Sequence, residues 1–167
     1  MKKFIFIFIC IGLFSCKEKN TKPEVKVDPQ LTVPAPSQIK LDVGSIPEEE
    51  FMKMYNNASY VDYIFYNLPF SISQNDQSSV RSNLGMISSE PLTSLQEGCK
   101  PIGREFFQID GVVAFEADLY YSEGCFGYVF MKDEKPIYAN KMSEEGLKFY
   151  GNLIEQAKQI QQGNVGK

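Results

Sequence analysis

The stretch from Cys99 to Cys125 constrains the fold more than any other part of this sequence. It consists of two apolar, aromatic-rich runs that meet at Asp110-Gly111 and are bounded by the two cysteines. An Asp-Gly pair between such runs is typical of a two-residue hairpin turn, because both central residues of a type I′ turn need a positive φ. The sequence therefore predicts a β-hairpin that a disulfide can close.

The turn also predicts the register of this hairpin, because residues at equal distances from the turn face each other. Counting outward from the turn places Phe106 opposite Phe115 and Glu105 opposite Glu116. The second pair brings two like charges together, which repel unless a cation such as Arg104 lies nearby. Near the turn both faces of the hairpin are apolar, so we expect a helix to cover the second face.

Two further strands are expected after the hairpin, over residues 125–131 and 136–139, with a turn between them. Together with the hairpin they form an antiparallel meander of about four strands. Residues 59–66 are rich in β-branched and aromatic side chains and favour another strand, with continuation of a preceding helix as the alternative.

Helical spacing of apolar residues predicts two short helices before the meander and a longer one after it. The first covers residues 47–57, the second follows Ser73, and the C-terminal helix runs from Ser143 to Gly163. The predicted fold class is therefore α+β, an antiparallel meander with two short N-terminal helices and a C-terminal helix packed on the sheet.

The N-terminus carries a targeting signal. Two lysines precede an apolar run from Phe4 to Phe14, which is too short to span a bilayer as a helix and is typical of a secretory signal. The motif Leu13-Phe14-Ser15-Cys16 then resembles the lipobox of bacterial lipoproteins, in which a small residue precedes the lipidated cysteine. The resemblance covers residues 1–16, and Phe14 is bulkier than the lipobox pattern prefers. An ordinary cleaved signal and an uncleaved segment are the alternatives.

This resemblance implies a signal peptide over residues 1–15 and acyl chains on Cys16, which becomes the mature N-terminus. The protein would then be exported and anchored by its lipid to a membrane of the cell envelope, with the outer membrane as the expected location. Residues 16–40 hold four of the nine prolines and no aromatic residue, so they are expected to form a disordered tether. A single globular domain over residues 41–163 and a short tail, 164–167, follow.

Charge and composition exclude several classes of function. The net charge of −4 leaves no basic footprint, so we expect no nucleic-acid partner. The chain has no histidine, which excludes Ser-His and Cys-His nucleophile systems and the usual zinc sites. It also lacks a glycine-rich phosphate loop and a calcium-loop motif, so no cofactor and no metal are expected.

Cys99 and Cys125 are the cysteines that remain if Cys10 is removed with the signal and Cys16 is lipidated. Two cysteines in an oxidising compartment usually pair, so we expect a structural disulfide between them. Two free thiols, or a redox or metal-binding pair, are the alternatives.

Two groups of side chains are candidates for a functional site. Acidic residues in and near the hairpin could form a glycosidase pair or simply a solvated strand face: Glu105, Glu116, Asp118 and Glu123. Tyrosines could form a patch that binds a ligand, or could be core residues: Tyr60, Tyr63, Tyr66, Tyr120, Tyr121 and Tyr128. We therefore expect a non-catalytic envelope lipoprotein that binds a partner protein, a glycan or another ligand. A carboxylate-dependent glycan hydrolase and a lipid carrier are the alternatives.

Overall fold

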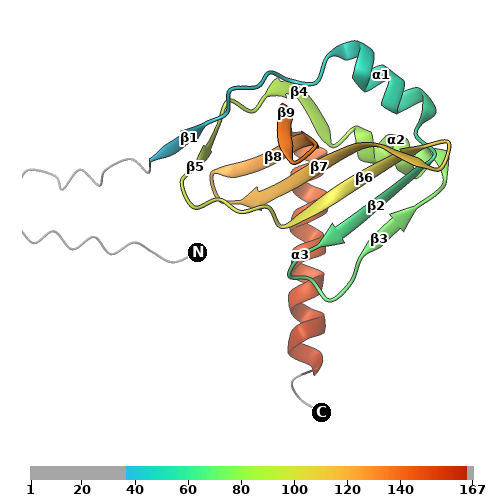
Figure 1. The fold of residues 1–167 in the computed structure, drawn as a ribbon. Helices are drawn as coiled ribbons and strands as arrows, with labels where there is room; N and C mark the ends of the chain where they lie inside the picture. Colours follow the sequence, from blue (N-terminus) through green and yellow to red (C-terminus); the bar gives the residue numbers. More distant parts are fainter. Residues whose placement is uncertain (1–36, 165–167) are drawn as a thin grey trace, which may run out of the picture. The chain divides into compact units, whose positions relative to one another are not determined.

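A seven-stranded antiparallel sheet organises residues 37–164, the part of the chain that the computed structural model describes (Figure 1). The strand order across the sheet is β3-β2-β6-β7-β8-β9-β4. In chain order the strands are Tyr60–Phe65 (β2), Ile72–Gln74 (β3), Ile87–Pro91 (β4), Gly103–Ile109 (β6), Val112–Ser122 (β7), Cys125–Lys132 (β8) and Lys135–Met142 (β9). The α+β class and the antiparallel sheet are confirmed, but the sheet has more strands than the four predicted.

The additional strands lie toward the edges of the sheet. The edge strands β3 and β4 have the sequences ISQ and ISSEP, and both are short and mostly polar. Short polar edge strands protect a sheet from pairing with other chains, and for the same reason they carry little hydrophobic periodicity. Residues 60–65 form β2, so the strand interpretation of this segment is correct and the helical alternative is wrong.

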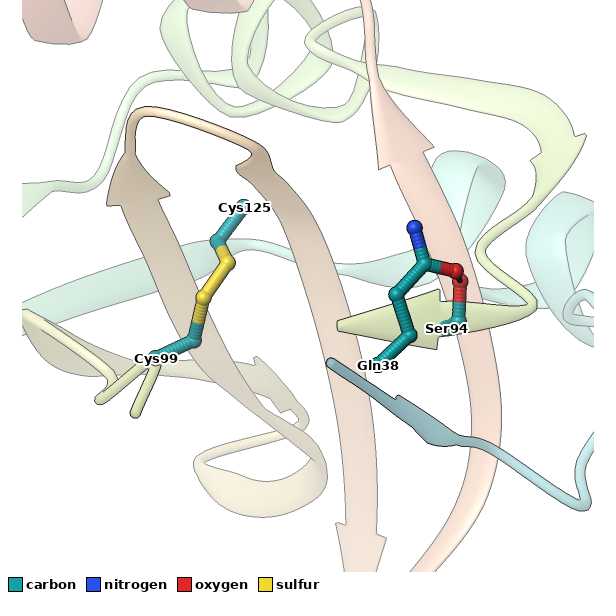
Figure 2. Close-up of a disulfide and its surroundings, with 4 residues drawn as sticks. All are labelled: Gln38, Ser94, Cys99 and Cys125. Carbon is teal, nitrogen blue, oxygen red and sulfur yellow. Dashed lines mark hydrogen bonds between the residues drawn. A yellow bond between two sulfur atoms is a disulfide. The ribbon is translucent and has the colours of Figure 1, made fainter. Parts of the chain in front are cut away.

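Two shorter strands form a separate ladder. Gln38–Lys40 (β1) pairs antiparallel with Ser94–Gln96 (β5), and the Ser94 hydroxyl donates a 2.9 Å hydrogen bond to the Gln38 side chain (Figure 2). Ordered structure therefore begins before residue 41, the predicted start of the domain. The predicted signal peptide, Cys16 and the tether up to residue 36 lie outside the described residues.

Three helices accompany the sheet: Glu48–Asn57 (α1), Gln77–Leu84 (α2) and Glu144–Asn164 (α3). Their apolar residues pack into the main core, which lies against one sheet face. Fully buried members of this core are Met54, Val80 and Leu84 from the helices and Phe107, Leu119 and Phe130 from the strands. No helix within residues 37–164 is long and apolar enough to cross a membrane.

A β-bulge at Ala114 sets the register of the β6–β7 hairpin. The turn has the predicted geometry, with φ of 53° at Asp110 and 78° at Gly111. Gln108 faces Val113, but Phe107 faces Phe115, so Ala114 has no partner on β6. The predicted register is therefore wrong beyond this point, because one extra residue moves every later side chain of β7 to the other face.

The bulge removes the predicted repulsion between two carboxylates. Glu105 faces Ala117, and Glu116 faces Phe106 on the other side of the sheet. The expected Glu105–Glu116 pair is thus wrong. Glu105 enters the core, whereas Glu116 stays on the face that carries Arg104 and Asp118.

A second, smaller core covers part of the opposite sheet face. It contains Leu92, Leu95, Cys125, Val129 and Ala139. The predicted disulfide between Cys99 and Cys125 is present beside this cluster, with the two Cα atoms 6.4 Å apart (Figure 2). Chain segments and a disulfide therefore cover this region of the opposite face.

Candidate functional site: a groove at the hairpin end of the sheet

A groove with a volume of about 690 Å³ lies between α1, the first residues of β7 (113–116) and the β8–β9 hairpin. This volume falls within the range typical of ligand-binding sites. Its apolar lining consists of Val113, Ala114, Phe115, Phe130, Met131, Ile137 and Tyr138. Its charged lining consists of Glu50, Lys53, Glu116, Lys132 and Asp133. The groove therefore combines an apolar surface with charges of both signs.

Two β-bulges shape the groove. The first leaves Ala114 unpaired on β7. The second lies between β8 and β9, where Phe130 faces Tyr138 but Met131 faces Pro136, so Ile137 is the extra residue. Both extra residues line the groove. Bulges bend strands and redirect side chains, and they are frequent beside functional sites.

The turn between β8 and β9 contributes backbone strain at the rim. Asp133 and Glu134 have φ of 49° and 61°, so two consecutive residues with side chains adopt the left-handed conformation. Such a conformation costs on the order of 1 kcal/mol per residue, and glycine would avoid that cost. Strained residues are concentrated at functional sites, and Asp133 lines this groove.

One charged side chain of the groove has a defined contact with its apolar surface. The Lys53 ammonium from α1 lies 5.9 Å from the centroid of the Phe115 ring on β7. A cation at this distance from an aromatic face is attracted to it. This contact joins two walls of the groove that are more than sixty positions apart in the sequence.

Arg104 organises the acidic residues on the adjacent sheet face. Its Nε donates a 2.7 Å hydrogen bond to Asp118 Oδ1, and its guanidinium also lies 3.5 Å from Glu116 Oε2 and 3.9 Å from Glu134 Oε1. Glu116 and Asp118 are thus both engaged in ion pairs with one arginine. Glu123, the remaining acidic candidate beyond the core, is exposed in the β7–β8 turn.

Glu105 has a different environment from the other acidic candidates. Its side chain is completely buried, and it accepts a hydrogen bond from the Tyr150 hydroxyl on α3. Burial raises the pKa of Glu105 to about 8, although the hydrogen bond from Tyr150 acts in the opposite direction. At neutral pH this carboxyl group is therefore mostly protonated. It does not converge with Glu116 and Asp118, which lie on the other sheet face.

The six candidate tyrosines do not form one patch. Tyr63 and Tyr128 are fully buried near Glu105, and Tyr121 donates a 2.9 Å hydrogen bond to the Leu147 carbonyl on α3. Tyr66, by contrast, is 52% exposed. Three of the six rings therefore belong to the main core, as the alternative interpretation proposed.

The remaining two candidates, Tyr60 and Tyr120, are half-buried. Burial and the neighbouring Asp118 carboxylate raise the pKa of Tyr120, with a further contribution from the Tyr66 hydroxyl. Tyr66 and Tyr120 thus lie near each other, beside the Arg104–Asp118 pair. They form a pair of one exposed and one half-buried ring rather than a six-residue binding patch.

Of the groove residues, only Glu116 was a candidate from the sequence, where it was named for a carboxylate pair and not for this groove. Asp133-Glu134 was recognised as a turn, but nothing in the sequence marks Ala114 or Ile137 as an extra residue in a strand. Within the described residues, no group of three or more acidic, histidine or cysteine side chains is arranged to hold a metal ion. Comparison of the chain with protein-family models, with curated proteins and with solved structures finds no match.

Proposed function

We propose that this protein is a non-catalytic, lipid-anchored binding protein of the cell envelope, and that the groove between α1, β7 and the β8–β9 hairpin is its binding site. The observation that carries this proposal is the convergence of two bulges and a strained turn on one groove. The two bulges depart from regular hairpin geometry, the turn holds two residues other than glycine at positive φ, and all three features border the same surface. A sheet that served only as a scaffold would not need them there.

The anchoring part of the proposal comes from the sequence. The lipobox-like segment ending at Cys16 supports lipidation and export, and the Cys99–Cys125 disulfide is consistent with an oxidising compartment. Replacing Cys16 with alanine should abolish incorporation of radiolabelled palmitate and release the protein from the membrane fraction. Unchanged labelling of the Cys16→Ala variant would refute lipidation at this residue.

The binding site can be tested in cells that express the full chain. A photoreactive phenylalanine analogue at Lys132, on the groove rim, should give a crosslinked product. The same analogue at Ile160, which is 48% exposed on α3, provides the matched control and should give none. Adding the substitution Ile137→Glu to the protein with the photoreactive analogue at Lys132 should abolish the crosslinked product, because it places a charge on the groove surface. Products that persist with Ile137→Glu, or that are equal at both positions, would refute the groove as the binding site.

A further inference from the structure

Strand β7 has an unpaired edge along the groove. Its ladder with β8 begins where Glu116 faces Met131, whereas its ladder with β6 continues to Val112 beside the turn. The edge of β7 from Val112 to Phe115 that faces away from β6 therefore has no strand partner among the described residues. No backbone hydrogen bond outside the ladders involves these four residues either.

This free edge is also apolar and exposed. Val112 is 67% exposed and Val113 is 49% exposed, and both belong to the distal part of the hairpin. An exposed apolar strand edge offers unpaired backbone groups to another chain and is a liability unless it is protected or used. The edge sequence from Val112 to Phe115, V-V-A-F, contains no lysine or proline, and the features beside it that could shield it are the bulge at Ala114 and Lys53 over the Phe115 ring.

The groove provides the space that an added strand needs. Val113, Ala114 and Phe115 form one wall, and Glu50 and Lys53 of α1 line the groove as well. A strand paired with β7 would lie about 4.8 Å from it, and side chains at alternate positions would point to the same side. The partly buried side chains of Ile137 and Tyr138 provide an apolar surface that can receive these alternate side chains.

The charges at the groove fit a partner that carries both signs. Among the described residues, four charged side chains of the lining make no ion pair: Glu50, Lys53, Lys132 and Asp133. Two are acidic and two are basic, so the lining favours neither a polyanion nor a polycation. A polypeptide with apolar residues at alternate positions and charged residues of both signs matches this arrangement.

We infer that the ligand of the groove is an extended peptide segment of a partner protein, which pairs with the free edge of β7 as an additional strand. This inference rests on the proposed function and specifies its ligand. Main-chain hydrogen bonds to residues Val112–Phe115 would hold the peptide, and alternate apolar side chains would enter the groove. The added strand would continue the sheet beyond the point where β8 ends.

The test begins with a displayed library of random eight-residue peptides, selected on the full chain. The best peptide is then synthesised with N-methyl groups on every second backbone amide, in two alternative registers. In the register whose methylated amides face β7, the Kd should rise at least tenfold. Methylation in the other register should change the Kd less than twofold, because only every second residue directs its backbone groups toward β7. The two peptides have identical side chains and serve as matched controls. Equal effects in both registers would overturn strand addition.

A protein variant provides a second measurement. Ala114→Pro removes a backbone N–H within the free segment, and it should weaken the selected peptide at least tenfold. Ile64→Thr, a β-branched substitution at an exposed position of β2 outside the groove lining, should bind within about threefold of the parent. Circular dichroism melting of both variants establishes that they fold. If the folded Ala114→Pro variant binds as the parent does, the inference is wrong.

NMR distinguishes failure of this inference from failure of the proposed function. Peptide-induced shifts at Val113, Phe115 and Ile137 without register-dependent methylation effects would keep the groove as a binding site and refute strand addition. If the selected peptides leave the NMR signals of these residues unchanged but a mixture of cell-wall glycan fragments shifts them, the groove is again a binding site and strand addition is again refuted. If neither probe shifts them, both proposals fall. Sedimentation that shows a dimer abolished by Ala114→Pro would identify a second copy as the occupant and refute a separate partner.

Discussion

The Tyr150 hydroxyl on α3 donates a hydrogen bond to the buried carboxyl group of Glu105 on β6. Both side chains have no solvent exposure, so this bond joins the C-terminal helix to the sheet inside the main core. The hydroxyls of Tyr63 and Tyr128 are also buried and lie close to the Tyr150 hydroxyl, but among the described residues neither has a partner that meets the geometric criteria of a hydrogen bond. One hydrogen-bonded acid–tyrosine pair therefore lies close to two unpaired hydroxyls, and this difference can be tested.

The stability of the fold should depend on the protonation of Glu105. Its pKa is about 8 in the folded protein, whereas an unperturbed glutamate titrates near 4.3. The folded state thus retains a proton that the unfolded state releases, so this contribution is fully present below about pH 4 and is lost as pH rises to about 8. Glu105→Gln removes this dependence while keeping a similar shape and an oxygen that accepts from Tyr150.

Urea unfolding of the parent and of Glu105→Gln at pH 5 and pH 8 measures this effect. Other titrating groups are shared, so they cancel in the comparison of the two proteins. Between these pH values the free energy of unfolding should shift in favour of the glutamine variant by up to about 4 kcal/mol. Parallel pH dependences for the two proteins would contradict a buried protonated carboxyl group.

Removing single hydroxyl groups should separate the bonded tyrosine from the unbonded ones. Tyr150→Phe deletes the donor to Glu105 and should lower the free energy of unfolding by about 1–3 kcal/mol. Tyr63→Phe deletes a buried hydroxyl without a partner, so it should be neutral or slightly stabilising. Both variants retain the ring and are measured by chemical denaturation at pH 6. A larger loss from Tyr63→Phe than from Tyr150→Phe would contradict this assignment.

The disulfide should contribute strongly to stability. Cys99 and Cys125 are 26 positions apart, and closing such a loop stabilises the folded state by about 3.5 kcal/mol in the chain-entropy model. The double variant Cys99→Ala, Cys125→Ala should therefore unfold at markedly lower urea concentration than the parent. Dithiothreitol should destabilise the parent to a similar extent and leave the double variant unchanged. A reductant effect of equal size on both proteins would show that the disulfide is not responsible.

The left-handed backbone conformation of the Asp133-Glu134 turn should lower the stability of the folded protein. Glu134→Gly provides a residue that adopts a φ of 61° without the steric cost of a Cβ atom. We expect a gain of about 1 kcal/mol in the free energy of unfolding, measured by thermal or urea denaturation. Because Glu134 also lies 3.9 Å from Arg104, Glu134→Gln is the control that removes the charge but keeps the strain. Equal gains from both substitutions would attribute the effect to charge instead of backbone strain.

The hairpin turn and the disulfide could be predicted because each depends on the identity of a few residues. Asp110-Gly111 specified its turn because positive φ values favour these residues, and the cysteine count specified the disulfide. The bulge at Ala114 had no such signal, since alanine has no special preference for an unpaired strand position. Its location depends on how β7 bends against its neighbours, and one extra residue separates Glu105 and Glu116, predicted to face each other, onto opposite faces of the sheet.

The groove was unpredictable for a related reason. Its walls come from α1, β7 and the β8–β9 hairpin, and only the folded sheet brings Lys53 to Phe115. The sequence left open whether the tyrosines form a patch or belong to the core, and period-two alternation places Tyr120 and Tyr121 on opposite faces. Residue type identified aromatic side chains, but only strand register decided which of them reached solvent.

The short ladder between β1 and β5 has a mechanical consequence. It joins only three residues on each strand, and β1 is the first described element at the N-terminal end of the domain. A force applied through the N-terminus would therefore load this ladder before it reached the seven-stranded sheet. If the proposed lipid anchors the N-terminus, rupture of β1 would lengthen the connection to the membrane while the disulfide-linked sheet and its groove stayed folded.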